Sequence, residues 1–347
     1  MVEINQGLSA LSVQSNSLNG QFVLGIESSC DDAGASVLKV PEGDVLSNII
    51  SSQVKTHSPY GGVVPELASR QHFKNIPAVV DMALEQAGIK FNDVALICAT
   101  SSPGLVGSLL VGLSYAKALA FSKKLPFLGV HHIEAHMMAV HLENKVNYPY
   151  VALVVSGGHT HLFLVRDFGK YELLGGTVDD AAGEAFDKVA KFFSLGFPGG
   201  PFVDKLSQKG NPKTYLFPRS FMEENNFKFS FSGLKTAVIQ HAKKYPESKL
   251  EDILASFQEA IVDVLVAKTK RAALKYECQN VVMCGGVACN SRLREAMKEI
   301  CQQFNLKFYA PTPILCTDNA AMVAYTGWQS WMHGRTSSDT LRSECDN

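Results

Sequence analysis

Two histidines four residues apart are the residues whose spacing points most directly to chemistry. His132 and His136 lie in the segment HHIEAHMMAVH. A separation of four places both imidazole rings on one face of a helix, with their Cβ atoms about 5–6 Å apart. Neutral imidazoles placed in this way can bind one divalent cation. The segment differs from the HExxH motif of metalloproteases because Ile133 follows His132. On spacing alone, a pair of histidines that binds no metal is an equally good interpretation.

A metal held by two histidines needs a further oxygen or nitrogen ligand from elsewhere in the chain. Asp318, in the segment CTDNAAM, is a candidate because it lies where a loop meets a predicted helix. The same position suits an N-cap, since a carboxylate there accepts a hydrogen bond from the first turn. The local sequence favours the N-cap.

Two glycine turns are candidates for binding an anion. Gly157 and Gly158, in VSGGHTH, separate two apolar runs and allow backbone N–H groups to approach a ligand, although an ordinary hairpin turn fits equally well. Gly285 and Gly286 follow an apolar run and open a predicted helix, an arrangement that suits a nucleotide. The segment is neither a GxGxxG motif nor a P-loop. Asn290 is placed either to contact a ribose or base, or to cap the helix.

Charged residues gather near several other turns. Glu27 and Asp31 flank the turn in GIESSCDD, where carboxylates could orient a metal, a water or an amine. The segment DDAAGEAFDKVAK is expected to form a solvated charged helix face. Five basic residues near turns are candidate phosphate contacts or solvated surface residues: Arg70, Lys74, Lys235, Arg292 and Arg294. A serine or cysteine nucleophile lacks support because no GxSxG pattern is present.

Composition limits the possible classes of protein. The chain has 347 residues, of which 46% are hydrophobic and 19% charged, so it can bury a large core, and its length suggests two domains. With 32 Lys and Arg against 33 Asp and Glu, the formal net charge is −1. Nucleic acid would therefore have to bind through a local basic patch or with partners. Eight cysteines without a CxxC pair indicate buried, reduced thiols of an intracellular protein.

Hydrophobic periodicity predicts an α/β fold with two related halves. Strands are expected at residues 22–26, 35–40, 45–53, 94–99, 127–130, 150–155, 160–165, 280–284 and 308–313, and helices at 65–88, 109–122, from about 131, 255–275, 291–300 and 318–328. Both halves begin with a strand, a small polar turn and a second strand, which suggests an internal duplication. The expected organisation is a polar lead-in at 1–21, a first lobe at 22–143, a second lobe at 144–330 and a tail at 331–347, which is expected to fray from residue 333 onwards. The longest uncharged stretch, 94–116, contains serine, proline and several glycines and reads as strand, turn and buried helix rather than as a membrane span.

Nine segments in order resemble one known family. They are GIESSCDD, GGVVPELASRQH, HIEAH, VSGGHTH, DDAAGEAFDKVAK, GFPGGP, FSFSGLKTA, GGVACNSRLR and CTDNAAM. Together they span residues 22–328, and they resemble the catalytic subunits of the tRNA adenosine threonylcarbamoyltransferase family, once labelled O-sialoglycoprotein endopeptidases. The chain departs from the usual pattern at Asp32, where the family often has Glu, at Cys289, where Ala is usual, and at Lys228, where an acidic residue is common.

The resemblance implies the two-lobed fold shared by actin, sugar kinases and heat-shock ATPases. It also implies transfer of a threonylcarbamoyl group from threonylcarbamoyl-AMP to N6 of adenosine 37 in tRNAs that read ANN codons. His132, His136 and Asp318 match the family's ligands for one divalent metal, Fe²⁺ or Zn²⁺. The positions that match its substrate-binding residues are Val155, Ser156, Gly157, Gly158, His159, Asp187, Gly200, Asp204 and Asn290. An ATP- or AMP-type nucleotide is expected in the cleft, and Glu27 and Asp31 are the candidates for accepting a proton.

The resemblance also bears on partners and location. The expected partners are tRNA, a pseudo-enzyme paralogue and a small P-loop ATPase, with a homodimer as a further possibility and no membrane. The N-terminal residues do not read as a targeting peptide, so a cytoplasmic location is expected, with a mitochondrial or plastid matrix as the alternative. Two other functions stay open on the sequence. One is a metal-dependent glycoprotein endopeptidase, and the other is a non-catalytic ATP-binding scaffold of the actin-like class.

Overall fold

The computed structural model describes residues 21–222 and 225–335 and contains two five-stranded sheets of the same topology. The strand orders are β3-β2-β1-β4-β5 and β8-β7-β6-β9-β10. In each sheet, the first strand pairs antiparallel with the second and parallel with the fourth. The predicted duplication is therefore confirmed. The strands are β1 (Gln21–Glu27), β2 (Asp32–Val40), β3 (Asp44–Ser52), β4 (Val94–Ser102), β5 (Phe127–His131), β6 (Tyr150–Val155), β7 (Thr160–Asp167), β8 (Lys170–Gly176), β9 (Asn280–Cys284) and β10 (Lys307–Tyr309).

The central strands are apolar because both of their faces are covered. In β6, Val151 and Leu153 belong to one hydrophobic core, whereas Ala152 and Val154 belong to another on the opposite face. Successive side chains of a strand point to opposite faces of its sheet, so a strand between two cores loses the alternation of apolar and polar residues. This explains why the runs at β1, β4, β6 and β9 can be recognised in the sequence.

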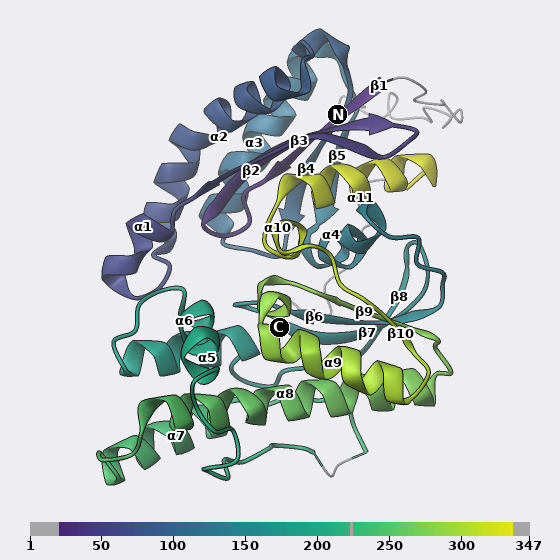
Figure 1. Ribbon diagram of the computed structural model, residues 1–347. Coiled ribbons are helices and arrows are strands. Elements are labelled where there is room, and N and C mark those ends of the chain that lie inside the picture. Colours follow the sequence, from purple (N-terminus) through teal and green to yellow (C-terminus); the bar gives the residue numbers. More distant parts are fainter. Residues whose placement is uncertain (1–20, 223–224, 336–347) are drawn as a thin grey trace, which may run out of the picture.

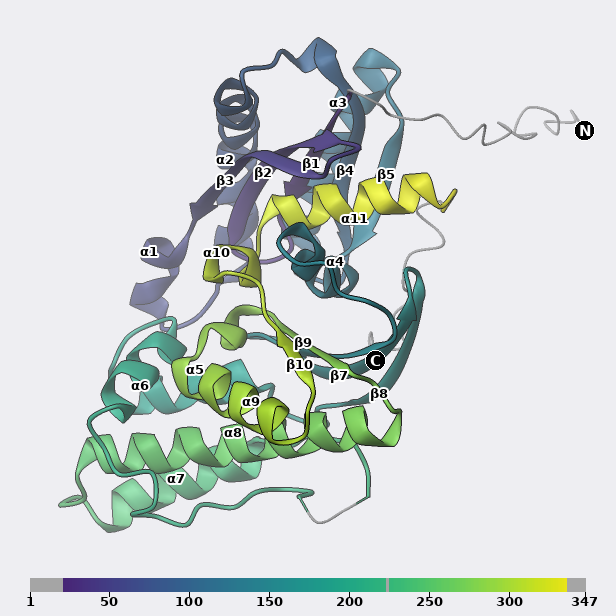
Figure 2. The ribbon, with the colours of Figure 1, turned by 45° about the vertical axis from the view of Figure 1, so that its right-hand side comes forward.

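Helices cover the outer face of each sheet. Figures 1 and 2 show α2 and α3 against the first sheet and the long α8, with α9 and α5, against the second. The predicted end of α2 is confirmed, because Gly88 follows Ala87 with φ 68°, a conformation that glycine adopts readily. The helices are α1 (Val54–His57), α2 (Pro65–Ala87), α3 (Val106–Lys123), α4 (His132–Met138), α5 (Ala182–Phe192), α6 (Gly199–Ser207), α7 (Ser232–Lys244), α8 (Leu250–Lys275), α9 (Ser291–Gln303), α10 (Pro313–Cys316) and α11 (Ala320–Met332). Four 3₁₀ turns complete the described elements: η1 (Ser58–Tyr60), η2 (Phe91–Asp93), η3 (Ala139–Leu142) and η4 (Gly286–Cys289).

The two inner helices lie between the two sheets. Helix α11 packs on the first sheet, although the predicted second lobe, 144–330, contains it. A β-carbon at Gly25 of β1 would collide with the backbone of Ala320 and Ala324, so glycine permits this close approach. Helix α4 follows the first sheet in the chain and contacts β4 and β5 of that sheet as well as β6 and β9 of the second. The second half therefore contributes α11 to the first sheet, α4 lies between the two sheets, and α4 and α11 form the junction between the lobes (Figure 2).

Some elements and one terminus differ from prediction. Strand β8 lies at a sheet edge with mostly exposed or half-buried residues, so its sequence carries little strand signal. The predicted tail, 331–347, is described as far as residue 335. Helix α11 continues to Met332, and Arg335 forms an ion pair with the buried Glu134 and lies over the ring of Phe168. The lead-in at residues 1–20 and the tail at 336–347 lie outside the described residues.

The remaining fold-level predictions concern membranes and cysteines. Within the described ranges, every helix is too short or too polar to cross a bilayer. The seven described cysteines are unpaired, and five of them are buried, as the sequence predicted.

Candidate metal and substrate site

Three predicted ligands meet at the junction of the lobes. One ligand atom from each of His132, His136 and Asp318 lies within 4.8 Å of the other two. The Nε2 atom of His136 is 3.2 Å from Asp318 Oδ1, and His132 Nε2 is 3.6 Å from the same oxygen. Helix α4 provides both histidines, and the residue pair before α11 provides the aspartate. The packing of α4 against α11 therefore brings the three side chains together.

Asp318 is free of the capping role that its local sequence favoured. Asn319 is the N-cap of α11, and its Oδ1 atom accepts a hydrogen bond from the N–H of Met322 at 3.0 Å. The N-cap interpretation of Asp318 is therefore wrong, since the neighbouring residue satisfies the helix end. The carboxylate of Asp318 faces the two histidines instead.

Glu27 contacts Nδ1 of His132, the ring nitrogen on the other side from Asp318. Its Oε2 atom lies 3.3 Å from His132 Nδ1 and accepts a hydrogen bond from Thr100 Oγ1 at 2.6 Å. Ser29 Oγ lies 3.2 Å from the same ring nitrogen. A carboxylate on Nδ1 fixes the orientation of an imidazole and leaves Nε2 directed at a metal. Neither hydroxyl was identified from the sequence. The serine adjoins the acidic turn, but Thr100, at the end of a distant strand, gave no signal.

The charges of this cluster suit a cation. Burial alone would lower the pKa of His132, but Asp318 and Glu27 raise it to about 9. Burial opposes the ionised form of Asp318, yet His132 and His136 hold its pKa below the usual range. Burial and the neighbouring His132 lower the pKa of His136. Two carboxylates thus favour one positive charge among the three ligands. A divalent metal bound by two nitrogens and one oxygen would supply that charge, so the residues fit the predicted metal.

The glycine turn lies beside the metal ligands. Ser156 and His159 close the turn, with Ser156 N–H donating to the His159 carbonyl oxygen at 2.8 Å and His159 N–H to Ser156 Oγ at 3.1 Å. It is a hairpin between β6 and β7, and the rings of His159 and His132 are 6.5 Å apart. A β-carbon on Gly157 or Gly158 would have no atom within 4 Å. The turn therefore leaves open space in front of both glycines.

Three of the four predicted nucleotide contacts, Asp187, Asp204 and Asn290, have side chains that bond the start of a helix in the second lobe, and the fourth, Gly200, lies in the first turn of α6. Asp187 Oδ1 accepts the N–H of Gly199 at 2.6 Å at the start of α6, next to Gly200. Asp204 Oδ1 accepts the hydroxyl of Ser291 at 2.8 Å and links α6 to α9. Asn290 caps α9, its Oδ1 atom accepting the N–H of Leu293 at 2.9 Å, as its alternative interpretation held. The residues thus form one connected row, and their side chains hold the helix starts.

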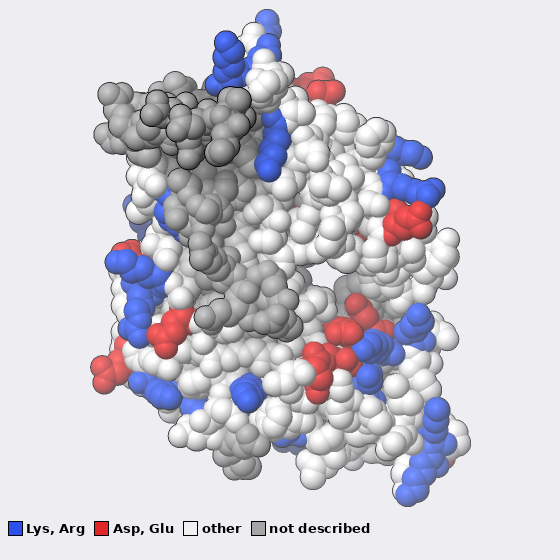
Figure 3. Space-filling model, turned by 180° about the vertical axis from the view of Figure 1, so that it is seen from behind, with Lys and Arg blue, Asp and Glu red and all other residues white. Residues whose placement is uncertain are grey.

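Asp31 belongs to the first lobe and is half-buried. Burial raises the pKa of its carboxyl, with a further contribution from the charge of Asp318. Burial also raises the pKa of Asp187, and the charge of Asp31 adds to this rise. Figure 3 shows a hollow between the lobes on the rear face, with acidic and basic side chains below it. On one side the lobes touch again, where Ser58 Oγ donates to the Phe197 carbonyl oxygen at 3.1 Å.

Most of the candidate phosphate contacts have internal partners. Arg292 forms an ion pair with Glu259 at 2.8 Å, and Arg294 donates to the carbonyl oxygen of Pro311 at 2.8 Å. Lys235 forms an ion pair with Asp180 at 2.9 Å. Arg70, paired only with its exposed helix neighbour Glu66, and the exposed Lys74 stay available to solvent. A basic patch around Arg70 and Lys74 is therefore a better candidate for phosphate contact than one around Arg292 and Arg294.

Solved structures share this fold at low sequence identity. The crystal structure of T.kodakarensis HypF aligns with a TM-score of 0.64 and 14% identity, covering 92% of this chain and 49% of that one. The component A of (R)-2-hydroxyglutaryl-CoA dehydratase from Acidaminococcus fermentans aligns with a TM-score of 0.57 and 16% identity, covering 90% of this chain and 99% of that one. These neighbours place the chain in the actin-like ATPase fold, as predicted.

Sequence relatives are much closer. The tRNA N6-adenosine threonylcarbamoyltransferase of Syntrophus aciditrophicus is 53% identical over 312 residues, which cover 88% of this chain and 91% of the relative. The enzyme of that name from Clostridioides difficile is 50% identical over 327 residues, covering 93% of this chain and 96% of the relative. The family model described as tRNA N6-adenosine threonylcarbamoyltransferase matches residues 44–325. The chain belongs to the tRNA N6-adenosine threonylcarbamoyltransferase family.

Proposed function

We propose that this acyltransferase moves the threonylcarbamoyl group from threonylcarbamoyl-AMP to N6 of adenosine 37 in tRNA, at a metal held by His132, His136 and Asp318. Membership of the family supplies the class of reaction. The observation that carries the metal is the convergence of three ligand atoms within 4.8 Å at the lobe junction. The glycine turn lies beside them, with His159 next to His132.

The reaction needs one bond to form and one to break. The exocyclic amine of the adenosine attacks the carbamoyl carbon, the bond from that carbon to the phosphate oxygen breaks, and AMP leaves with the electron pair. A bound Fe²⁺ or Zn²⁺ would act as a Lewis acid toward a carbonyl or phosphate oxygen. The N–H groups of Gly157 and Gly158 stabilise the negative charge that develops during attack.

A base must accept the proton that the amine loses. Glu27 is fully buried and already bonded to His132 and Thr100, so it acts by orienting His132. Asp31 is half-buried and belongs to the same turn. We assign the proton-accepting role to Asp31, because it is partly exposed whereas Glu27 is fully buried.

The adenylate portion of the donor lies along the row of helix starts in the second lobe. The carboxylates of Asp187 and Asp204 accept hydrogen bonds from ribose hydroxyls, and Gly200 leaves room for the ligand because a β-carbon there would have no atom within 4 Å. Asn290 acts through the start of α9, which it caps. The same row would take an ATP- or AMP-type nucleotide.

The partners and location stay as the resemblance implies. They are tRNA, a pseudo-enzyme paralogue, a small P-loop ATPase and a cytoplasmic site, with a homodimer or an organellar matrix as alternatives. The exposed Arg70 and Lys74 are the proposed phosphate contacts, and such contacts weaken as salt concentration rises. Neither a glycoprotein endopeptidase nor a non-catalytic scaffold gains support. The relatives are named as transferases, and a scaffold needs no metal ligands.

The test replaces both histidines and measures metal and product separately. The His132→Ala/His136→Ala variant should lose its bound metal, and its transfer rate should fall at least about 100-fold. Bound metal is measured by elemental mass spectrometry and modified tRNA by nucleoside mass spectrometry. His141→Ala is the matched control, because His141 follows the same segment and contacts Tyr150 instead of the metal ligands. Full tRNA modification by the metal-free double variant would falsify the metal model.

A further inference from the structure

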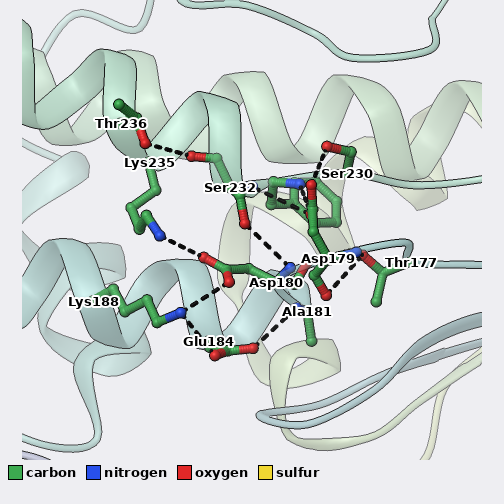
Figure 4. Close-up of polar contacts among 11 residues, drawn as sticks. Thr177, Asp179, Asp180, Ala181, Glu184, Lys188, Ser230, Ser232, Lys235 and Thr236 are labelled. Atoms are coloured by element: carbon green, nitrogen blue, oxygen red, sulfur yellow. Dashed lines mark hydrogen bonds and ion pairs between the residues drawn. The ribbon is translucent and has the colours of Figure 1, made fainter. Parts of the chain in front are cut away.

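The segment DDAAGEAFDKVAK, expected to be a solvated face, is instead the centre of a polar network. Figure 4 shows two neighbouring aspartates, Asp179 and Asp180, with polar side chains from α5 and α7 directed at them. Asp180 is only 9% exposed. The expectation of a solvated charged face is therefore wrong for this part of the segment, and a buried carboxylate requires partners.

Asp180 joins two helices through two ion pairs. Its Oδ1 atom lies 2.8 Å from Lys188 Nζ of α5, and its Oδ2 atom lies 2.9 Å from Lys235 Nζ of α7 (Figure 4). Burial opposes ionisation of Asp180, but hydrogen bonds from Lys188 and Lys235 hold its pKa below the usual value. Lys188 also pairs with Glu184 at 2.8 Å. The carboxylate thus fixes the start of α5 against α7.

Asp179 holds the other side of the same junction. Its Oδ1 atom accepts the N–H groups of Phe231 at 2.8 Å and Ser232 at 3.3 Å, and its Oδ2 atom accepts the hydroxyl of Ser230 at 2.6 Å. These are the residues at the beginning of α7, so Asp179 supplies acceptors that the helix end needs. The two aspartates therefore connect the starts of α5 and α7.

The start of α5 in turn holds the glycine turn. The N–H of Gly183 donates to the carbonyl oxygen of Ser156 at 3.2 Å, and the N–H of Ala182 donates to Thr160 Oγ1 at 2.9 Å. A β-carbon on Gly183 would collide with the backbone of Ser156 and Gly157. The first N–H groups of α5 are thus directed at the two ends of the turn, and α5 lies against it without a side chain between them.

We propose that Asp180 and Lys235 are positioning residues that keep the glycine turn in its reactive geometry through the start of α5. The inference rests on the proposed role of Gly157 and Gly158. Donors that stabilise developing charge must be held in place before the reaction, since misplacement by about 1 Å can cost 100-fold in rate. The ion pair between Asp180 and Lys235 limits the movement of the start of α5 relative to α7. Because the start of α5 donates hydrogen bonds to Ser156 and Thr160, the position of the glycine turn is limited as well.

The test removes one charge of the pair and compares it with a conservative and a remote change. Lys235→Met should lower kcat about 10-fold, with the KM for tRNA unchanged. Lys235→Arg should recover most of the rate because it retains a cation near Asp180. Lys243→Met, which changes an exposed lysine of the same helix, should behave as the unmodified protein. Rates are measured with the full chain and its partners, well below the melting temperature of each variant.

Hydrogen exchange supplies a readout that does not depend on activity. In Lys235→Met, the peptide that contains residues 156–160 should exchange faster, whereas the peptide at residues 28–31 should not change. Asp180→Asn should also lower kcat and speed exchange at residues 156–160. This variant replaces Lys235→Met in the test if Lys235→Met does not fold. The double variant should be no slower than Asp180→Asn alone, because that substitution already breaks the ion pair with Lys235. An unchanged kcat and unchanged exchange at the turn, with only a lower melting temperature, would overturn the proposal.

The metal content separates this proposal from the proposed function. Lys235→Met should retain its metal, because Asp180 and Lys235 lie outside the three ligands. If the metal-free histidine variant still modifies tRNA, the metal model fails. Faster exchange at the turn with a lower kcat in Lys235→Met would then still support the positioning role.

Discussion

The first hairpin turn of each lobe occupies the same place in the duplicated fold. Residues 28–31 join β1 to β2, and residues 156–159 join β6 to β7. The first turn is preceded by Glu27 and contains Ser29 and Asp31, whereas the second has Gly157 and Gly158 at its centre. The two turns have the same length because the two sheets share one topology. Their residue types differ, and this difference suits the two turns to different roles.

The surroundings of the two turns differ as much as their residues. In the first lobe, a β-carbon on Gly104 or Gly112 would collide with Ser29 or Ser28, so the turn is packed closely against the loop before α3 and α3 itself. In the second lobe, the space in front of Gly157 and Gly158 is open. The two related sheets thus carry one closed turn, which contacts the proposed metal ligand His132, and one open turn, which is the proposed substrate side.

We expect the largest effect, a loss of metal affinity, from a substitution beside the closed turn at residues 28–31. Glu27→Gln removes the charge behind His132 while keeping a similar shape, so metal affinity should fall about 10- to 100-fold. The measurement is a titration of metal against a competing chelator. Glu85→Gln, at an exposed position of α2, is the control and should bind metal as before. Unchanged metal affinity in Glu27→Gln would mean that the closed turn does not support the metal.

The open turn should respond in activity and not in stability. Gly158→Ala adds a methyl group to open space, so the melting temperature should stay the same while kcat/KM falls about 10-fold as the group obstructs the substrate. Gly285→Ala offers the contrast, because Gly285 has φ 93° and its β-carbon would collide with Val155. That variant should lose stability as well. Normal kinetics in Gly158→Ala would remove the turn from the site.

Helix α4, which the closed turn contacts through His132, is also held by an ion pair of its residue Glu134 with Arg335. Arg335→Met removes the cation next to Glu134 on α4, and the free energy of unfolding should fall by about 2 kcal/mol. Tyr171 still donates to Glu134 at 2.9 Å, so the fold should persist. Urea unfolding measures the loss, and Arg166→Met, at an exposed ion pair, should cost at most about 1 kcal/mol. Equal losses of unfolding free energy in both variants would show that the ion pair between Arg335 and Glu134 does not stabilise α4 more than an exposed ion pair would.

The smallest effect concerns acid. Because the pKa of Asp180 is lowered in the folded protein, its pairs stabilise the fold above the ordinary pKa of an aspartate, and this contribution disappears as pH falls through the folded value. Asp180→Asn should therefore be less stable than the unmodified protein at pH 7, and the difference should shrink steadily below about pH 4. Unfolding curves across this range test it, and a difference that persists in acid would show that charge is not responsible.

The local sequence was sufficient to predict the central strands and the division of the fold into two related halves. Apolar runs located the central strands, the turn residues separated them, and their repetition revealed two related halves, because burial on both faces leaves a signal in a short segment. The spacing of His132 and His136 placed two ligands on one helix face for the same reason: helix geometry is local. The family's motifs then added Asp318 and the substrate residues.

Only the tertiary structure decided which residues work together. His136 and Asp318 are 182 residues apart, and they meet because α4 and α11 each pack toward the other half of the chain. Whether Asp318 caps a helix or faces the two histidines depended on Asn319 serving as the N-cap, and whether Lys235 is solvated depended on Asp180. Such choices depend on contacts between distant segments, whose free energies no local window of sequence contains.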